Sequence, residues 1–319
     1  MKRREFLLAA AATPFALPHL ATAATARHGL VLVTADLASH IVVVDGATGR
    51  VRRRIATREA PRAIERVGRA NAVVAHTTEG LVSIIDGDNR RVDKVLRGFQ
   101  HPRYVAVHPR LEFAYVTDSA AGEVAVIDLR RQAVVRRVDV GGAARHVSIS
   151  ASGTRLWTAL GSTASHLAVL DTSTPDRPRL LRRVRAPFLA HDVVIAPNLG
   201  SVWVTSGDRG RIAIYRLNGA KLIGQIAAAA SPQHVAFVAG RAFVASGDDG
   251  SVRVHDAASG RLQRTTTVPA GSFNVTAGGG RIATPSLERG SIVILDRAGR
   301  VLHERHVAAS SHDACWIAA

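Results

Sequence analysis

The sequence predicts an all-β protein, a seven-bladed β-propeller. Three observations predict it: a short strand-like segment recurs seven times, its copies are 40 to 45 residues apart, and the two ends of the chain supply complementary strands of one unit. A period of this length is typical of a four-stranded propeller blade. No helical periodicity separates the copies.

The recurring segment alternates apolar residues and usually ends in aspartate. Its copies are Ile41–Asp45, Val82–Asp86, Val124–Asp128, Leu167–Asp171, Ile212–Arg216, Val252–Asp256 and Ile292–Asp296. Their last residues lie 41, 42, 43, 45, 40 and 40 positions apart. A single four-stranded sheet cannot bury both faces, whereas a ring of seven packs every face on a neighbour.

The third unit shows the four expected strands in order. They cover residues 104–107, 113–117, 124–128 and 133–138, and turns at His108–Leu111 and Ala120–Gly122 separate the first three. Short β-branched runs between turn residues are hairpin chemistry. The other units repeat this order.

The ends of the chain predict how the ring closes. The first expected strand, Leu30–Thr34, is of the second type, and the last, His312–Ile317, is an unpaired strand of the first type. We expect the C-terminal strand to complete the blade of residues 29–56, which removes two exposed sheet edges. Cys315 is the only cysteine, so an internal disulfide is excluded and packing must stabilise the ring.

The N-terminus predicts export. Residues 1–26 combine a charged head containing Arg3-Arg4, a short apolar stretch and small-residue cleavage positions, which is typical of a twin-arginine signal peptide. We therefore expect a single propeller domain over 27–319, located in the periplasm or outside the cell. No later segment is long and apolar enough to be an integral membrane span.

The formal net charge of +17 suggests an anionic ligand, a nucleic acid, an acidic envelope polymer or an acidic partner protein. The arginines are scattered along the chain without a basic tract, so genomic base composition explains the charge equally well.

Aligning the residues that lead into the first strand of each blade gives two tiers that should face the central channel. The first tier is Arg62, Arg103, Arg145, His191, Gln233, Phe273 and His312. The second tier is Ala63, Tyr104, His146, Asp192, His234, Asn274 and Asp313. Seven-fold geometry would bring these residues together in a funnel of ligand size.

Two chemistries are open at this funnel. Arg62, Arg103 and Arg145 come from consecutive blades and would form an arc suited to a carboxylate or phosphate. His146, His191, His234 and His312 are candidate metal ligands, with Asp192 and Asp313 beside them. A structural alternative also stands, because His and Asp at these positions can bond the backbone of neighbouring blades.

Two resemblances follow from particular segments. Ala114–Ser119, Gly122 and Val124–Asp128 resemble the YVTN repeat of bacterial extracytoplasmic (YncE-like) propellers, a resemblance that covers residues 29–319 and implies the fold but no single activity. Ala186–Asp192 resembles a loop of the haem d1 propeller of cytochrome cd1-type nitrite reductases, which implies His191 as a haem-facing residue. That family has eight units, so the cofactor is not carried over and stays unknown.

The sequence favours an exported binding or scaffold propeller without turnover of its own, which holds an anionic ligand or an acidic partner segment. The alternatives are a metal- or haem-dependent redox or hydrolytic enzyme and a purely structural interaction module. No nucleophile elbow, zinc-protease or paired-cysteine motif is present.

Overall fold

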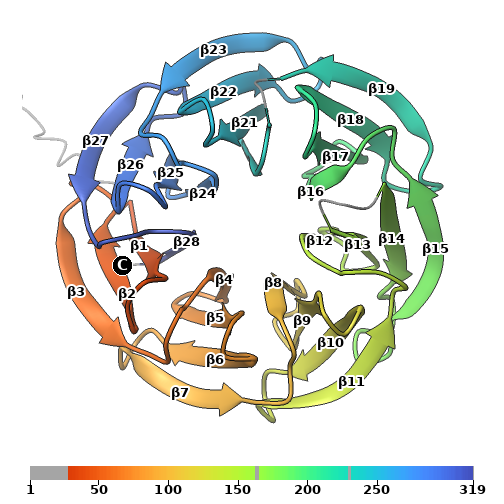
Figure 1. The fold of residues 1–319 in the computed structure, drawn as a ribbon, viewed down its shortest axis with the longest axis horizontal. Coiled ribbons are helices and arrows are strands. Elements are labelled where there is room, and N and C mark those ends of the chain that lie inside the picture. Colours follow the sequence, from red (N-terminus) through yellow and green to blue (C-terminus); the bar gives the residue numbers. More distant parts are fainter. Residues whose placement is uncertain (1–27, 162–164, 229–230, 319) are drawn as a thin grey trace, which may run out of the picture.

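The computed structural model describes residues 28–161, 165–228 and 231–318. In these ranges the chain forms seven antiparallel sheets of four strands each. Figure 1 shows the sheets arranged radially around a common axis, with the first strand of each innermost and the fourth outermost. The predicted seven-bladed β-propeller is confirmed. The described part of the chain contains no helix able to cross a membrane. The predicted signal peptide, 1–26, lies outside the described residues.

The blades follow one another along the chain. Blade 1 consists of β28 (Ala314–Ile317), β1 (Leu30–Ala35), β2 (His40–Asp45) and β3 (Val51–Ala56). Blade 2 consists of β4 (Ala63–Val67), β5 (Asn71–His76), β6 (Leu81–Asp86) and β7 (Arg91–Leu96). Blade 3 consists of β8 (Pro102–Val107), β9 (Phe113–Asp118), β10 (Glu123–Asp128) and β11 (Ala133–Asp139). Blade 4 consists of β12 (Val147–Ile149), β13 (Arg155–Ala159), β14 (His166–Asp171) and β15 (Arg179–Arg185).

The remaining three blades repeat the same order. Blade 5 consists of β16 (Ala190–Ala196), β17 (Ser201–Ser206), β18 (Arg211–Arg216) and β19 (Leu222–Ala227). Blade 6 consists of β20 (Val235–Val238), β21 (Arg241–Ser246), β22 (Ser251–Asp256) and β23 (Leu262–Thr267). Blade 7 consists of β24 (Thr276–Gly278), β25 (Arg281–Pro285), β26 (Ser291–Leu295) and β27 (Val301–His306).

The ring closes as the ends of the chain predict. β28 pairs antiparallel with β1, so that Ala314 lies opposite Val33. Buried Trp316 of β28 packs in an apolar cluster with side chains of blade 7. Its ring lies so close to Gly278 that a Cβ there would come within 2.2 Å of Trp316, so this position requires glycine. The last strand therefore joins blade 1 to blade 7.

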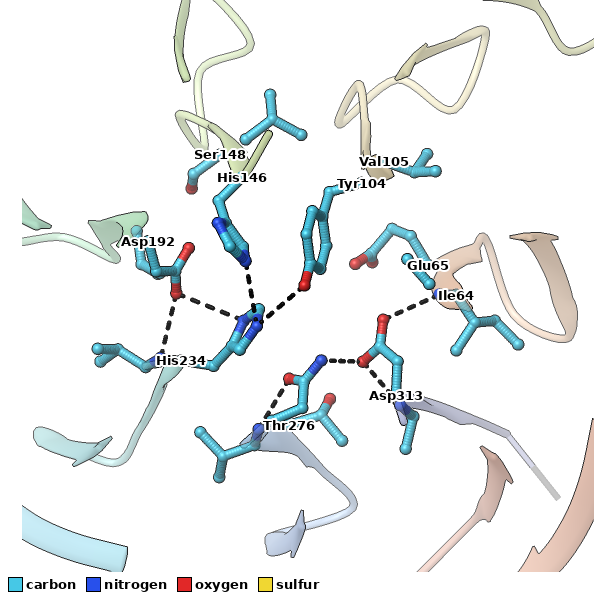
Figure 2. Close-up of a pocket in the computed structure, with 17 residues that line it drawn as sticks. Ile64, Glu65, Tyr104, Val105, His146, Ser148, Asp192, His234, Thr276 and Asp313 are labelled. Carbon is cyan, nitrogen blue, oxygen red and sulfur yellow. Dashed lines mark hydrogen bonds and ion pairs between the residues drawn. The ribbon is translucent and has the colours of Figure 1, made fainter. Parts of the chain in front are cut away.

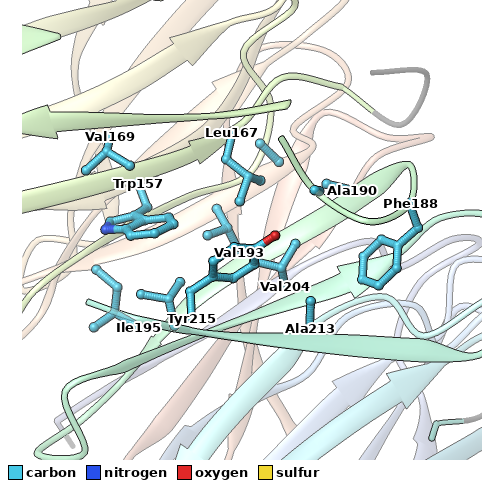
Figure 3. Close-up of a cluster of buried hydrophobic side chains, with 13 residues drawn as sticks. Trp157, Leu167, Val169, Phe188, Ala190, Val193, Ile195, Val204, Ala213 and Tyr215 are labelled. Carbon is cyan, nitrogen blue, oxygen red and sulfur yellow. The ribbon is translucent and has the colours of Figure 1, made fainter. Parts of the chain in front are cut away.

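Apolar side chains from adjacent blades form the core. Between blades 4 and 5, Trp157 packs against Tyr215, with ring centroids 6.0 Å apart (Figure 3). Trp203, at the equivalent position of blade 5, packs against Phe237 of blade 6, with ring centroids 5.4 Å apart. Both tryptophans are essentially fully buried, which confirms that they serve packing between blades.

Two innermost strands depart from regular pairing at the channel mouth. In β8 the register shifts between Pro102 and Val105, and in β16 between Ala190 and Val193. Each shift places two first-strand residues opposite one partner, which is a β-bulge. The bulges contain Arg103-Tyr104 and His191-Asp192, which are four of the predicted site residues.

Candidate functional site at the propeller axis

A cavity of about 210 Å³ lies on the propeller axis and is lined by the innermost strands of all seven blades (Figure 2). Every second-tier residue lines it, together with residues one or two positions further along each strand. The described first-tier residues are not among its lining. The structure thus brings the second tier together, as follows: Ala63, Tyr104, His146, Asp192, His234, Asn274 and Asp313.

The two buried aspartates of this tier join neighbouring blades. Asp313 accepts hydrogen bonds from the backbone N–H of Ala314 and, across the interface, from that of Ile64 at 2.9 Å. Asp192 makes the same pair of bonds, to Val193 in its own blade and to Val235 in the next. These carboxylates satisfy buried backbone donors, which supports the structural interpretation for the aspartates.

Asn274 and Asp313 are also bonded to each other. The amide of Asn274 donates to Asp313 Oδ1, and its own oxygen accepts from Val275 N–H. Asn274 therefore links blade 7 to the strand that closes the ring.

Threonines of the second strands, which the sequence analysis did not single out, hold these residues in place. Thr117 Oγ1 accepts the N–H of Tyr104 and donates to the carbonyl of Arg145 in the next blade. Thr205 and Thr34 make the equivalent bonds around Asp192 and Asp313. Each threonine occupies the fifth position of its strand, so the repeat itself carried the signal.

Three histidines from blades 4, 5 and 6 meet above the cavity. One nitrogen each from His146, His191 and His234 lies within 4.8 Å of the others. His146 Nε2 and His234 Nε2 are 3.2 Å apart, and the Tyr104 hydroxyl lies 3.3 Å from the same His234 nitrogen. The Tyr104 ring also stacks on His146, with centroids 4.0 Å apart.

Asp192 lies beside His234. Its Oδ2 is 3.6 Å from His234 Nδ1, whereas His146 approaches Nε2 of the same ring (Figure 2). A carboxylate beside Nδ1 favours the tautomer that carries its proton there. The Nε2 lone pair of His234 then faces His146 and Tyr104.

Burial keeps these imidazoles neutral. It lowers the pKa of His191 to about 4, with a further contribution from Arg145. Burial and the neighbouring histidines lower the pKa of His146 and His234 well below the ordinary value. Neutral imidazoles are the form that binds metal ions.

The arginines of the first tier, here called the arginine arc, lie close enough for the charges of Arg145 and Arg62 to act on Arg103. Burial, together with the charges of Arg145 and Arg62, lowers the pKa of Arg103. The Nε–H of Arg103 is buried, and no residue in the described ranges accepts a hydrogen bond from it. Arg62 lies 3.6 Å from Asp36, whereas no carboxylate in the described ranges forms an ion pair with Arg103.

The two remaining polar residues of the first tier bond the backbone instead. His312 Nδ1 lies 3.0 Å from the carbonyl of Arg62, and burial lowers its pKa to about 3, with Arg62 adding to the effect. Gln233 Oε1 accepts the N–H of Gly247 at 3.0 Å. His312 is not part of the three-histidine cluster.

Glu65 is a cavity residue that the sequence analysis did not identify. Burial raises its pKa to about 7, and the negative charge of Asp313 adds to this. Burial likewise raises the pKa of Asp313 and of Asp192 to about 7. Three acidic side chains, from blades 1, 2 and 5, therefore lie at the cavity.

Comparisons with known proteins identify the fold. No family model and no curated protein sequence matches this chain. The chain is similar to a chain of Kuenenia stuttgartiensis hydrazine synthase, with 17% identity over 86% of this chain and 94% of the other, and a TM-score of 0.74. A functionally unknown protein from Desulfotomaculum acetoxidans is similar over 91% and 99% of the two chains, with 11% identity and a TM-score of 0.79.

The dihydro-heme d1 dehydrogenase NirN, solved in complex with DHE, shares 17% identity over 88% of this chain, with a TM-score of 0.64. This chain covers 64% of the NirN chain. At these identities the likeness shows the propeller fold and leaves the activity open.

Proposed function

We propose that this chain is an exported, YVTN-type β-propeller binding protein that holds an anionic ligand at its channel mouth, without turnover of its own. The twin-arginine-type N-terminus supports export to the periplasm or the cell exterior.

The environment of Arg103 is the observation that carries this proposal. Its guanidinium lies near two others, Arg145 and Arg62, which lower its pKa. Its buried Nε–H lacks an acceptor among the described residues. Clustering like charges costs free energy that a bound anion would recover, and guanidinium groups bind carboxylates and phosphates through paired hydrogen bonds.

The axial cavity of about 210 Å³ is lined by second-tier residues and not by the arginines, so we expect the ligand to contact the arginine arc outside this cavity. The paired N–H groups of a guanidinium suit a carboxylate or phosphate group. A terminal acidic group of a larger partner would meet the same arc.

Two alternatives have support of their own. A metal- or haem-dependent enzyme is favoured by the three histidines that meet beside Tyr104. A purely structural module is favoured by Asp192 and Asp313, whose carboxylates bond the backbone of adjacent blades. Under the structural alternative, replacing Arg103, Arg145 and His191 together leaves every binding property unchanged.

Calorimetric titration with inorganic phosphate and with citrate tests the proposal. Chelator-treated protein in low-salt buffer binds at least one of them, and Arg103→Gln weakens binding about tenfold or more, because a hydrogen bond to a charged group contributes about 1.5–3 kcal/mol. Arg53→Gln is the matched control, since Arg53 is an exposed arginine of β3.

The comparison of the two arginine variants separates a specific site from attraction by the overall charge. Binding that disappears equally in the Arg103 and Arg53 variants reflects the overall charge and contradicts the proposal. The absence of binding by both ligands at low ionic strength also contradicts it.

A further inference from the structure

We propose that His146, His191 and His234 form a binding site for a divalent first-row transition metal ion, with zinc as the reference ion. The site uses different side chains from the arginine arc and does not depend on the anion proposal.

The spacing of the imidazole nitrogens fits a shared ion. Zinc binds histidine nitrogens at about 2.0–2.1 Å in tetrahedral geometry, so two ligands of one zinc ion lie about 3.3 Å apart. The Nε2 atoms of His146 and His234 are 3.2 Å apart. The nearest His191 nitrogen is within 4.8 Å of both, so a small rotation of this partly exposed ring would complete the set.

Two groups approach a single lone pair in this cluster. With its proton on Nδ1, facing Asp192, His234 has a single lone pair on Nε2. Two groups approach that lone pair, His146 Nε2 and the Tyr104 hydroxyl. One lone pair accepts one good hydrogen bond. A metal ion between the two Nε2 atoms would instead bind the Nε2 lone pairs of both histidines.

Other buried histidines of this chain behave differently. His76 Nδ1 lies 2.7 Å from the carbonyl of Glu59, His255 Nδ1 lies 3.0 Å from that of Gly260, and His312 likewise faces a backbone carbonyl. These contacts fix a backbone segment through its carbonyl group. His146 and His234 instead direct their Nε2 atoms at each other across two blades, which holding a loop does not require.

The surroundings resemble those of functional metal sites. Metal-bound histidines usually give their second N–H to a carboxylate, and Asp192 lies in that position beside His234. Asp192 is itself fixed by two backbone N–H groups and by Thr205, which supports its N–H.

The nearby positive charge argues for an additional anionic ligand. The positive charge of Arg145 acts on all three histidines, and the same field opposes a dication. Three imidazoles leave a tetrahedral ion with one open position. An anion there would contact both the metal ion and the arginine arc, and Tyr104 would donate to it.

Metal titration of the chelator-stripped full chain tests the site. Zinc chloride should bind with one-to-one stoichiometry, cobalt(II) should give the visible absorption bands of a tetrahedral complex, and magnesium should not compete. His191→Ala should weaken zinc binding at least tenfold. His101→Ala, which removes an exposed histidine of the neighbouring blade, should leave it unchanged.

Further variants separate this site from the anion site and from misfolding. Asp192→Asn, a change at a positioning residue, should weaken zinc binding about 10- to 100-fold. Arg103→Gln should keep zinc binding even where it abolishes phosphate binding. Zinc should raise the Tm of the wild-type protein but not that of His191→Ala, whose metal-free Tm shows that it is folded. Equal zinc binding by wild type, His191→Ala and His101→Ala, or none in wild type, overturns the proposal.

Discussion

The inner and outer ends of the blades use charge in different ways. The outermost strands β3, β7, β11 and β15 carry exposed arginines, and one of them, Arg52, pairs with Asp45 at 2.6 Å while remaining 59% exposed. These are edge strands, and charged side chains there oppose pairing with other chains. At the axis, Arg103 is partly buried and lacks an acceptor at Nε among the described residues. The total charge of +17 therefore does not distinguish these two regions, whereas the burial of Arg103 does.

The largest expected effect comes from removing the innermost strand that closes the ring. Deleting residues 310–319 removes β28 and Trp316, exposes the β1 edge and separates blade 1 from blade 7. We expect loss of the cooperative thermal transition, or aggregation, in circular dichroism melts and size-exclusion chromatography. A monomer with a near-wild-type Tm would show that the ring closes without this strand.

Replacing an aspartate should lower the free energy of unfolding more at the inner end of a blade than at the outer end. Asp313→Ala leaves the N–H groups of Ile64 and Ala314 without their acceptor inside the protein, and we expect a loss of about 3 kcal/mol in the free energy of unfolding. Asp45→Ala removes the cap of an exposed turn at Thr48 and should cost about 1 kcal/mol. Urea denaturation compares them. Equal losses would contradict the structural role assigned to Asp313.

The repeat predicted the fold because each blade needs the same apolar alternation and the same turns. The aligned blade entries also include every second-tier residue of the axial cavity, although none of the described first-tier residues lines it. The repeat did not predict which of the aligned residues bond the backbone: His191 and His312 occupy equivalent positions, yet one joins a histidine cluster and the other holds a carbonyl. Glu65 was missed because its role depends on Asp313, which lies 248 positions away in the sequence and belongs to another blade.

A smaller effect should appear in the pH dependence of stability. Burial and Asp313 raise the pKa of Glu65 from 4.5 to about 7, while Arg66 and Cys315 also lie nearby. Between those values the native state keeps a proton that the unfolded chain releases, so stability falls as pH rises from about 4.5 to about 7. Glu65→Gln removes this loss, and its Tm relative to wild type should rise by about 2 °C or more between pH 5 and pH 8.

Asp45→Asn is the matched control from the outer end of a blade. Burial opposes ionisation of Asp45, but hydrogen bonds from Arg52 and Thr48 lower its pKa from 3.8 to about 2. Its contribution to stability is therefore complete above about pH 4 and is lost as the pH falls toward 2. The Tm difference between this variant and wild type should stay constant from pH 5 to pH 8. A constant difference for Glu65→Gln as well would contradict the raised pKa.

The smallest expected effect on stability comes from the outermost strands. Replacing Arg53, Arg136 and Arg182 with glutamine removes three exposed charges from different blades, and we expect each to change the free energy of unfolding by less than about 0.5 kcal/mol.

If a nucleic acid or an acidic polymer binds this outer surface, the triple variant should elute from heparin at lower salt, because each lost phosphate or sulfate contact lowers the salt dependence of binding by about one counterion. Phosphate binding at the axis should not change. Unaltered heparin elution together with weaker phosphate binding would contradict this assignment of the two regions. The outer arginines would then act on the axial ligand, and the polymer would bind elsewhere.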